Sequence, residues 1–173
     1  MATSLYDLSV ATYLQTLGGV AGVLQRGLDH FSDNGIDPNA VVEARLFDDM
    51  LPFKFQIWSV SHHSIGAIEG IKKGVFNPPG AMPALDYAGL QKVVSDAVQA
   101  LGSLEWSEVN ALEGKDVAFQ FGEFKVPFVA ETFVMSFSLP NFYFHAATTY
   151  DILRTKGVPL GKRDFMGKLR MKA

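Results

Sequence analysis

The chain has 173 residues, a formal net charge of −3 and no cysteine. Because 48% of its residues are hydrophobic, it can bury one sizeable core, and we expect a single domain over residues 1–173. A slightly acidic chain lacks the basic surface typical of nucleic-acid-binding proteins. A chain without cysteine has no disulfides, thiolate metal ligands or cysteine nucleophiles. Any site must therefore use nitrogen and oxygen atoms.

The first nine residues lack the basic and apolar regions of a signal peptide. The most apolar stretch, residues 128–150, is interrupted by a glutamate, several hydroxyl residues, an asparagine and a histidine, so no window reaches the 18 apolar residues of a membrane span. We expect a soluble protein that makes no membrane contact. The absence of cysteine fits a reducing compartment, and we expect a cytoplasmic location.

Apolar residues spaced three and four apart predict four long helices. They cover residues 5–31, from Pro52 to about 73, from Asp86 to about 102, and about 130–156. Asp37 as an N-cap and Pro38 as the first helical residue predict a short accessory helix to about Arg45. Pro140 lies inside the last helix, where it removes a backbone hydrogen bond and is expected to introduce a kink.

Three glycines, Gly18, Gly19 and Gly22, interrupt the first predicted helix. Each costs up to about 1 kcal/mol relative to alanine in a helix interior. A close approach of another segment or a local bend would offset this cost. The alternative is that the glycines are only a weak point of the helix.

Between the third and fourth long helices the apolar pattern changes to strict alternation over residues 116–128. The alternation is interrupted at Gly122 and Glu123, which predicts a β-hairpin with its turn at these two residues. Because an isolated hairpin is only marginally stable in water, its phenylalanine face should pack on the bundle or on a second subunit.

Four polar residues follow helical spacing in the apolar fourth helix: Ser138, Asn141, His145 and Thr149. Asn141 and His145 lie one turn apart, and the other two extend the same face. A buried amide or imidazole without partners costs roughly 1–3 kcal/mol. These four residues are our candidate ligand-binding residues, and their partner is a metal, a ligand or only another helix.

The second predicted helix carries two adjacent histidines, His62 and His63, about 100° apart on a helix, so they cannot face the same point. His62 continues an apolar stripe with Phe55, Trp58 and Ile65. We therefore prefer His62 as the histidine that faces a pocket.

Several segments resemble the domain of unknown function 1993 family. They are residues 4–10 (SLYDLSV), 35–38 (GIDP), 44–46 (ARL) and, above all, 139–145 (LPNFYFH) and 157–165 (GVPLGKRDF). The resemblance extends over essentially the whole chain. It implies an all-α fold, a DinB-like four-helix bundle with a short accessory helix and a small β-hairpin before the last long helix.

The resemblance also implies a site. DinB-like and YfiT-like bundles often bind a divalent metal through one histidine of the second helix and a His-x-x-x-His pair of the fourth. Transferred to this chain, the pair becomes Asn141 and His145, and the second-helix ligand is near His62, so His62 and His145 are the candidate metal ligands. An amide oxygen is a weak ligand for zinc or nickel, so the metal site is altered or lost.

Two functional classes remain. The first is a binding or structural protein with an internal Asn/His pocket and a degenerate metal site. The second is a metal-dependent hydrolase or thiol transferase that uses zinc, nickel or manganese. The abundant phenylalanines of the fourth helix and the hairpin predict a homodimer interface, and the pocket predicts a small-molecule ligand. Whether the protein is an enzyme is left open by the sequence.

Overall fold

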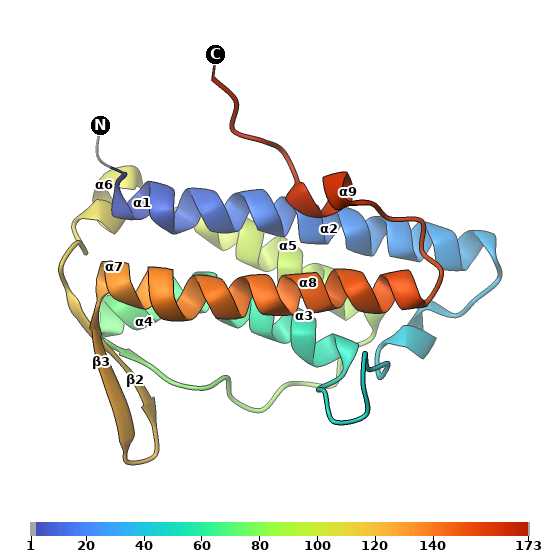
Figure 1. The fold of residues 1–173 in the computed structure, drawn as a ribbon, viewed down its shortest axis with the longest axis horizontal. Helices are drawn as coiled ribbons and strands as arrows, with labels where there is room; N and C mark the ends of the chain where they lie inside the picture. The colour runs from blue at the N-terminus through green and yellow to red at the C-terminus, as the bar shows by residue number, and fades with distance from the viewer. Residues whose placement is uncertain (1–2, 173) are drawn as a thin grey trace.

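A computed structural model describes residues 3–172 as a four-helix bundle with a small β-sheet at one end (Figure 1). The bundle and the sheet are built from the following elements: α1 (Leu5–Leu8), α2 (Val10–Asp33), η1 (Pro38–Val41), α3 (Phe53–His62), α4 (Ile65–Lys73), β1 (Val75–Phe76), α5 (Tyr87–Gly102), α6 (Trp106–Asn110), β2 (Asp116–Phe121), β3 (Phe124–Val129), α7 (Ala130–Phe133), η2 (Val134–Ser138), α8 (Leu139–Thr155) and α9 (Lys162–Met166).

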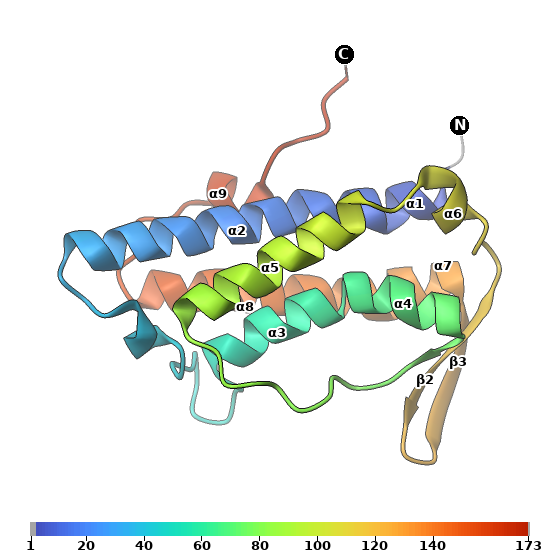
Figure 2. The same ribbon diagram turned by 180° about the vertical axis from the view of Figure 1, so that it is seen from behind.

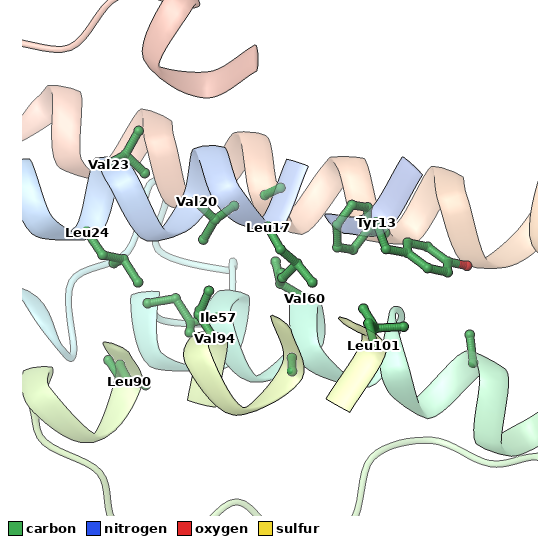
Figure 3. Close-up of a cluster of buried hydrophobic side chains, with 14 of the residues drawn as sticks. Tyr13, Leu17, Val20, Val23, Leu24, Ile57, Val60, Leu90, Val94 and Leu101 are labelled. Carbon is green, nitrogen blue, oxygen red and sulfur yellow. The ribbon is translucent and has the colours of Figure 1, made fainter. Parts of the chain in front are cut away.

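The long helices close around one core. Helix α2 packs against α5 and α8, and α3 packs against the same two helices, so the four form a ring (Figures 1 and 2). Their facing side chains, among them Leu17, Ile57 and Val94, are fully buried (Figure 3). Among residues 3–172, no helix is both long and apolar enough to cross a membrane.

The first two predicted long helices are each divided in two by a serine, which corrects the prediction of continuous helices. The Ser9 hydroxyl donates to the Leu5 carbonyl at 2.6 Å, and the Ser64 hydroxyl donates to the Val60 carbonyl at 2.8 Å. Both serines leave helical geometry, with ψ of −81° and −88°. A serine that bonds to the carbonyl four residues back weakens and bends a helix. Periodicity alone does not reveal these interruptions, because the apolar spacing continues across them.

The last long helix is divided differently. It begins as α7, passes through the π-helical segment η2 and continues as α8. Pro140 is the second residue of α8 and directly follows the π-helical segment. The irregularity that we expected as a kink at Pro140 is therefore the π-helical segment just before it. Such segments often mark functional sites.

The predicted hairpin is confirmed, with Phe121 opposite Phe124 across a turn at Gly122, whose φ is 58°. The structure adds β1, which pairs in parallel with β2 to give a three-stranded sheet in the order β1-β2-β3. The all-α prediction is therefore corrected to a mostly helical fold with a small mixed sheet. A strand of two residues is too short to give a periodic signal.

Shorter elements also differ from the prediction. The accessory helix is a single 3₁₀ turn that ends at Val41 rather than near Arg45, although the Asp37 side chain caps it by accepting from the Asn39 N–H at 2.9 Å. The structure also contains α6 and α9, which the sequence did not predict. Each has five residues, too few for a helical repeat.

Helix α9 explains one of the three glycines of α2. A Cβ at position 19 would overlap the carbonyl oxygen of Phe165, so the predicted close approach is confirmed at Gly19. Nothing lies within 4 Å of a Cβ built at Gly18 or Gly22. The docked α9 is also held by an ion pair between Arg26 and Asp164.

We predict opposite effects on stability for two neighbouring glycines. Gly19→Ala should destabilise the protein by about 1–3 kcal/mol, the usual cost of overpacking, because α9 must move away. Gly18→Ala is the matched control and should stabilise it by about 0.5–1 kcal/mol, because it only removes the helix cost of glycine. Urea unfolding of both variants measures the difference. Equal effects would contradict the role of Gly19 in docking α9.

Candidate functional site

The break between α3 and α4 places two histidines beside the sheet. His63 is the C-cap of α3 and is only 7% exposed, whereas His62 is half-buried. The ring of Phe76, from β1, lies 4.4 Å from the His62 ring and 5.5 Å from the His63 ring, measured between centroids. Phe137, from η2, lies 5.9 Å from the His63 ring. The sheet and the π-helical segment therefore enclose these imidazoles in aromatic side chains.

A chain of hydrogen bonds connects the break to α8. The Ser138 hydroxyl donates to the His63 carbonyl at 2.6 Å, a carbonyl that the interrupted helix leaves free. The same hydroxyl oxygen lies 2.6 Å from the Tyr13 hydroxyl. Because Ser138 has only one hydroxyl proton, Tyr13 is the donor of that second bond. Burial raises the pKa of Tyr13 well above its usual value, so Tyr13 keeps the proton that it donates.

His145 faces α3 and is held there by Gln56. The Gln56 Nε2 donates to the Leu51 carbonyl at 2.7 Å, which fixes the orientation of the amide and directs Oε1 towards His145. The distance from His145 Nδ1 to this oxygen is 2.8 Å. Because an amide oxygen only accepts hydrogen bonds, Nδ1 carries the proton. The lone pair of His145 is therefore on Nε2, which makes no hydrogen bond in the part of the chain that the structure describes.

His145 and His63 lie side by side as neutral rings. Their centroids are 5.9 Å apart and their planes differ by 17°. Burial lowers the pKa of His63 to about 3, with further lowering by the imidazoles of His62 and His145. Burial also lowers the pKa of His145 to about 4, with a smaller effect from His62. Both rings are therefore neutral at pH 7, and His63 Nδ1 is buried without a hydrogen-bond partner among residues 3–172.

The other candidate residues have different surroundings. Asn141 is half-buried and its Nδ2 donates to the Phe137 carbonyl at 2.8 Å, which leaves Oδ1 as its available acceptor. Thr149 is fully buried and donates to the His145 carbonyl at 2.9 Å. Ser138 is also fully buried and is used by Tyr13 and His63. Thus Asn141 and His145 present free acceptor atoms, whereas the hydroxyls of Ser138 and Thr149 donate within the protein.

The histidine near His145 is His63 rather than the expected His62. The His62 Nε2 instead lies 2.9 Å from the Asn77 carbonyl. Sequence reasoning also missed Gln56. A signal for both residues was available, because Gln56 and His63 are seven residues apart and so share one face of a helix.

The residues present do not reproduce the three-histidine metal site that the resemblance implies. Over residues 3–172, no three His, Cys, Asp or Glu side chains form a group that could hold a metal ion. The rings of His63 and His145 lie 5.9 Å apart, and position 141, where the resemblance implies the third histidine, carries an amide. Two imidazoles and a neutral amide oxygen are a weaker set of ligands for zinc or nickel than three imidazoles.

Comparisons with known proteins agree with this fold. A family model described as "Domain of unknown function (DUF1993)" matches residues 5–166. The chain is also similar to the crystal structure of a DinB family member protein from Shewanella denitrificans, with a TM-score of 0.78 and 19% sequence identity. The similarity covers 98% of this chain and 95% of that one, and at this identity it shows the fold alone. A search of curated proteins found no match.

We predict that the two neutral imidazoles make stability fall in mild acid. Unfolded histidine has a pKa near 6.5, so the unfolded state takes up protons below this pH before the folded state does. The free energy of unfolding should be highest above pH 6.5 and should fall towards pH 4, where His145 titrates, and pH 3, where His63 titrates. Each group contributes at most about 1.4 kcal/mol per pH unit.

Urea unfolding between pH 4 and pH 8 measures this slope. It should become shallower in His63→Gln and in His145→Gln, and shallower again in the double variant. Asn141→Ala, one turn from His145, is the control for local disruption without loss of a titrating group, and it should keep the wild-type slope. An unchanged slope in both histidine variants would refute the assignment of neutral rings.

Proposed function

Because the chain belongs to the domain of unknown function 1993 family, in which no activity is defined, we propose from the site itself that it is a binding protein with a degenerate metal site. In this proposal a small molecule binds where the family resemblance implies a metal. His145 and Asn141 contact the ligand, and the ring of His63 forms an adjacent aromatic wall.

One observation carries this proposal, the fixed tautomer of His145. Gln56 holds the proton on Nδ1, and the low pKa keeps the ring neutral, so Nε2 is a permanent acceptor at pH 7. Asn141 contributes a second acceptor, Oδ1, because its Nδ2 is already paired with the Phe137 carbonyl. Two acceptors one helical turn apart match a ligand that donates hydrogen bonds, such as an alcohol or a neutral amine.

The second candidate is a metal-dependent hydrolase or thiol transferase. It is favoured by the contact between Gln56 and His145, because a histidine that binds a metal typically donates its other ring N–H to an oxygen acceptor. His145, His63 and Asn141 would then supply the ligand atoms. The neutral amide at position 141 is the reason why we rank this candidate second.

Metal analysis of protein purified without a histidine tag separates the two candidates. We expect zinc, nickel and manganese to be far below one ion per chain in the wild type, with no difference between wild type, His145→Ala and the control His30→Ala. His30 is a suitable control because it lies at the other end of the bundle, in the last turn of α2. A stoichiometric metal that is lost in His145→Ala and retained in His30→Ala would overturn the binding proposal and favour the enzyme.

We also infer a homodimer, formed through the tip of the hairpin's phenylalanine face. Nearer the bundle this face packs on it, where the Phe119 ring lies 4.8 Å from the Phe137 ring. At the tip, Phe121 and Phe124 are 67% and 62% exposed. Large exposed aromatic side chains often supply the energy of interfaces.

A sizing column at micromolar concentration tests the dimer. The wild type should elute as a dimer, and the double variant Phe121→Ser with Phe124→Ser should elute as a monomer. Phe47→Ser is the matched control, since Phe47 is 68% exposed but lies in the loop before α3. A monomeric wild type, or a dimer that is lost only in the Phe47 variant, would be inconsistent with this interface.

A further inference from the structure

The C-terminal segment has a charge opposite to that of the rest of the chain. Residues 162–172, which we call the basic segment, contain five of the chain's 15 basic residues and only one of its 18 acidic residues. The formal charge of the segment is therefore +4, whereas all other residues together carry −7. The small net charge of the whole chain conceals this asymmetry, which is typical of a basic tail that binds an anionic partner.

The cations of the basic segment are not neutralised by carboxylates of the same chain. Over residues 3–172, the one ion pair that involves the segment joins its single acid, Asp164, to Arg26. Arg170 hydrogen-bonds to acceptors without charge: the Gln15 Oε1 and the Thr12 hydroxyl, each at 3.3 Å, and a backbone carbonyl of α1 at 3.5 Å. The other four cationic side chains are exposed, namely Lys162, Arg163, Lys168 and Lys172.

The segment is fixed at its base and projects at its end. A Cβ at Gly167 would lie 2.3 Å from the Gln15 carbonyl oxygen, and φ at Gly167 is 63°, so a glycine is needed where the chain turns against α2. The Gln15 side chain holds both sides of this turn, because its Nε2 donates to the Met166 carbonyl at 3.2 Å and its Oε1 accepts from Arg170. Beyond the turn the chain rises from α2 and points away from the bundle (Figures 1 and 2).

Apolar side chains alternate with the cations at this projecting end. Leu169 and Met171, on either side of Arg170, are 47% and 82% exposed. Exposed apolar side chains among lysines and arginines are typical of segments that bind a lipid surface, where the cations meet anionic headgroups and the apolar groups enter the boundary with the acyl chains. Aromatic side chains, which nucleic acids favour for stacking, are represented only by Phe165, whose ring packs against Tyr150.

The shape of the chain also favours an extended, flat partner. A flat surface meets the projecting end of the basic segment before it meets the bundle. The remainder of the protein, with its charge of −7, then stays further from the anionic surface, and salt screens charges beyond a Debye length of about 8 Å at physiological ionic strength.

We propose that the basic segment attaches the protein reversibly to the surface of membranes that contain anionic lipids. Its cations bind the headgroups, and Leu169 and Met171 enter the interface. The expectation of no membrane contact was based on the lack of a spanning segment, and attachment by a tail needs none. The proposal is independent of the ligand site, because His145 and Asn141 lie outside the segment.

Sedimentation of the full chain with lipid vesicles tests the proposal. Vesicles of phosphatidylcholine with about one third phosphatidylserine should bind the wild type, and vesicles of phosphatidylcholine alone should bind it at least about tenfold more weakly. Binding should also weaken at least about tenfold when sodium chloride is raised from about 0.05 to about 0.5 M, because added salt screens the attraction.

Two pairs of charge variants determine whether the segment is responsible. Lys168→Gln with Lys172→Gln should weaken binding to the anionic vesicles at least about tenfold. Lys73→Gln with Lys125→Gln is the matched control, since it removes two exposed lysines from α4 and β3 with the same change in net charge, and its binding should change less than about twofold. Equal losses in the two pairs, or no binding of the wild type to anionic vesicles, would overturn the proposal.

A third variant separates a lipid surface from other anionic partners. Leu169→Ser with Met171→Ser keeps every charge but removes the apolar groups, and it should weaken vesicle binding at least about fivefold. Unchanged vesicle binding in this variant would contradict insertion of the segment. Tighter binding of the wild type to double-stranded DNA or to poly-glutamate than to the anionic vesicles would overturn the proposal in favour of a nucleic acid or an acidic protein.

Discussion

The hydrogen bonds that meet at the Ser138 hydroxyl hold together the two irregular points of the bundle. The interruption of α3 and α4 frees the His63 carbonyl, and the π-helical segment places Ser138 where it can donate to it. Tyr13 completes the chain from α2. Each of these groups is fully or nearly fully buried, so loss of one partner would leave a polar group unpaired at a cost of about 1–3 kcal/mol. The position of His63, and with it the whole candidate site, depends on this connection.

The small sheet helps to lower the pKa values of the histidines. Phe76 and Phe119 come from β1 and β2, and Phe137 from η2 packs against them. These rings exclude water from the side of the bundle where His62 and His63 lie. Loss of hydration disfavours the charged imidazole, which is the main reason why the pKa values fall. The hairpin is therefore part of the site even though none of its residues bonds to a histidine ring.

The sequence predicted one half of the candidate site better than the other. The polar face of the last helix was visible from spacing, and His145 does meet a side chain of another helix, as one of the open alternatives required. The partner on α3 was not predicted, because Gln56 was not considered and the two histidines were compared only by their place relative to an apolar stripe. The choice of His62 over His63 assumed that apolar neighbours point to the pocket. In the structure Trp58, His62 and Ile65 of that stripe line a separate pocket, and only Phe55 lies beside the His145 ring, at 5.9 Å between centroids.

Local patterns in the sequence were sufficient to predict the approximate extent of the long helices, but not their interruptions, and the hairpin with its turn, because periodicity and turn chemistry depend on residues that are close along the chain. The tertiary structure decided the features that depend on distant residues. These are the pairing of β1 with β2, the docking of α9 on Gly19 and the tautomer of His145, whose partner Gln56 is 89 residues away in the chain. Hydrogen bonds and close contacts of this kind form only when packing brings the segments together, and apolar spacing contains no information about their distance or orientation.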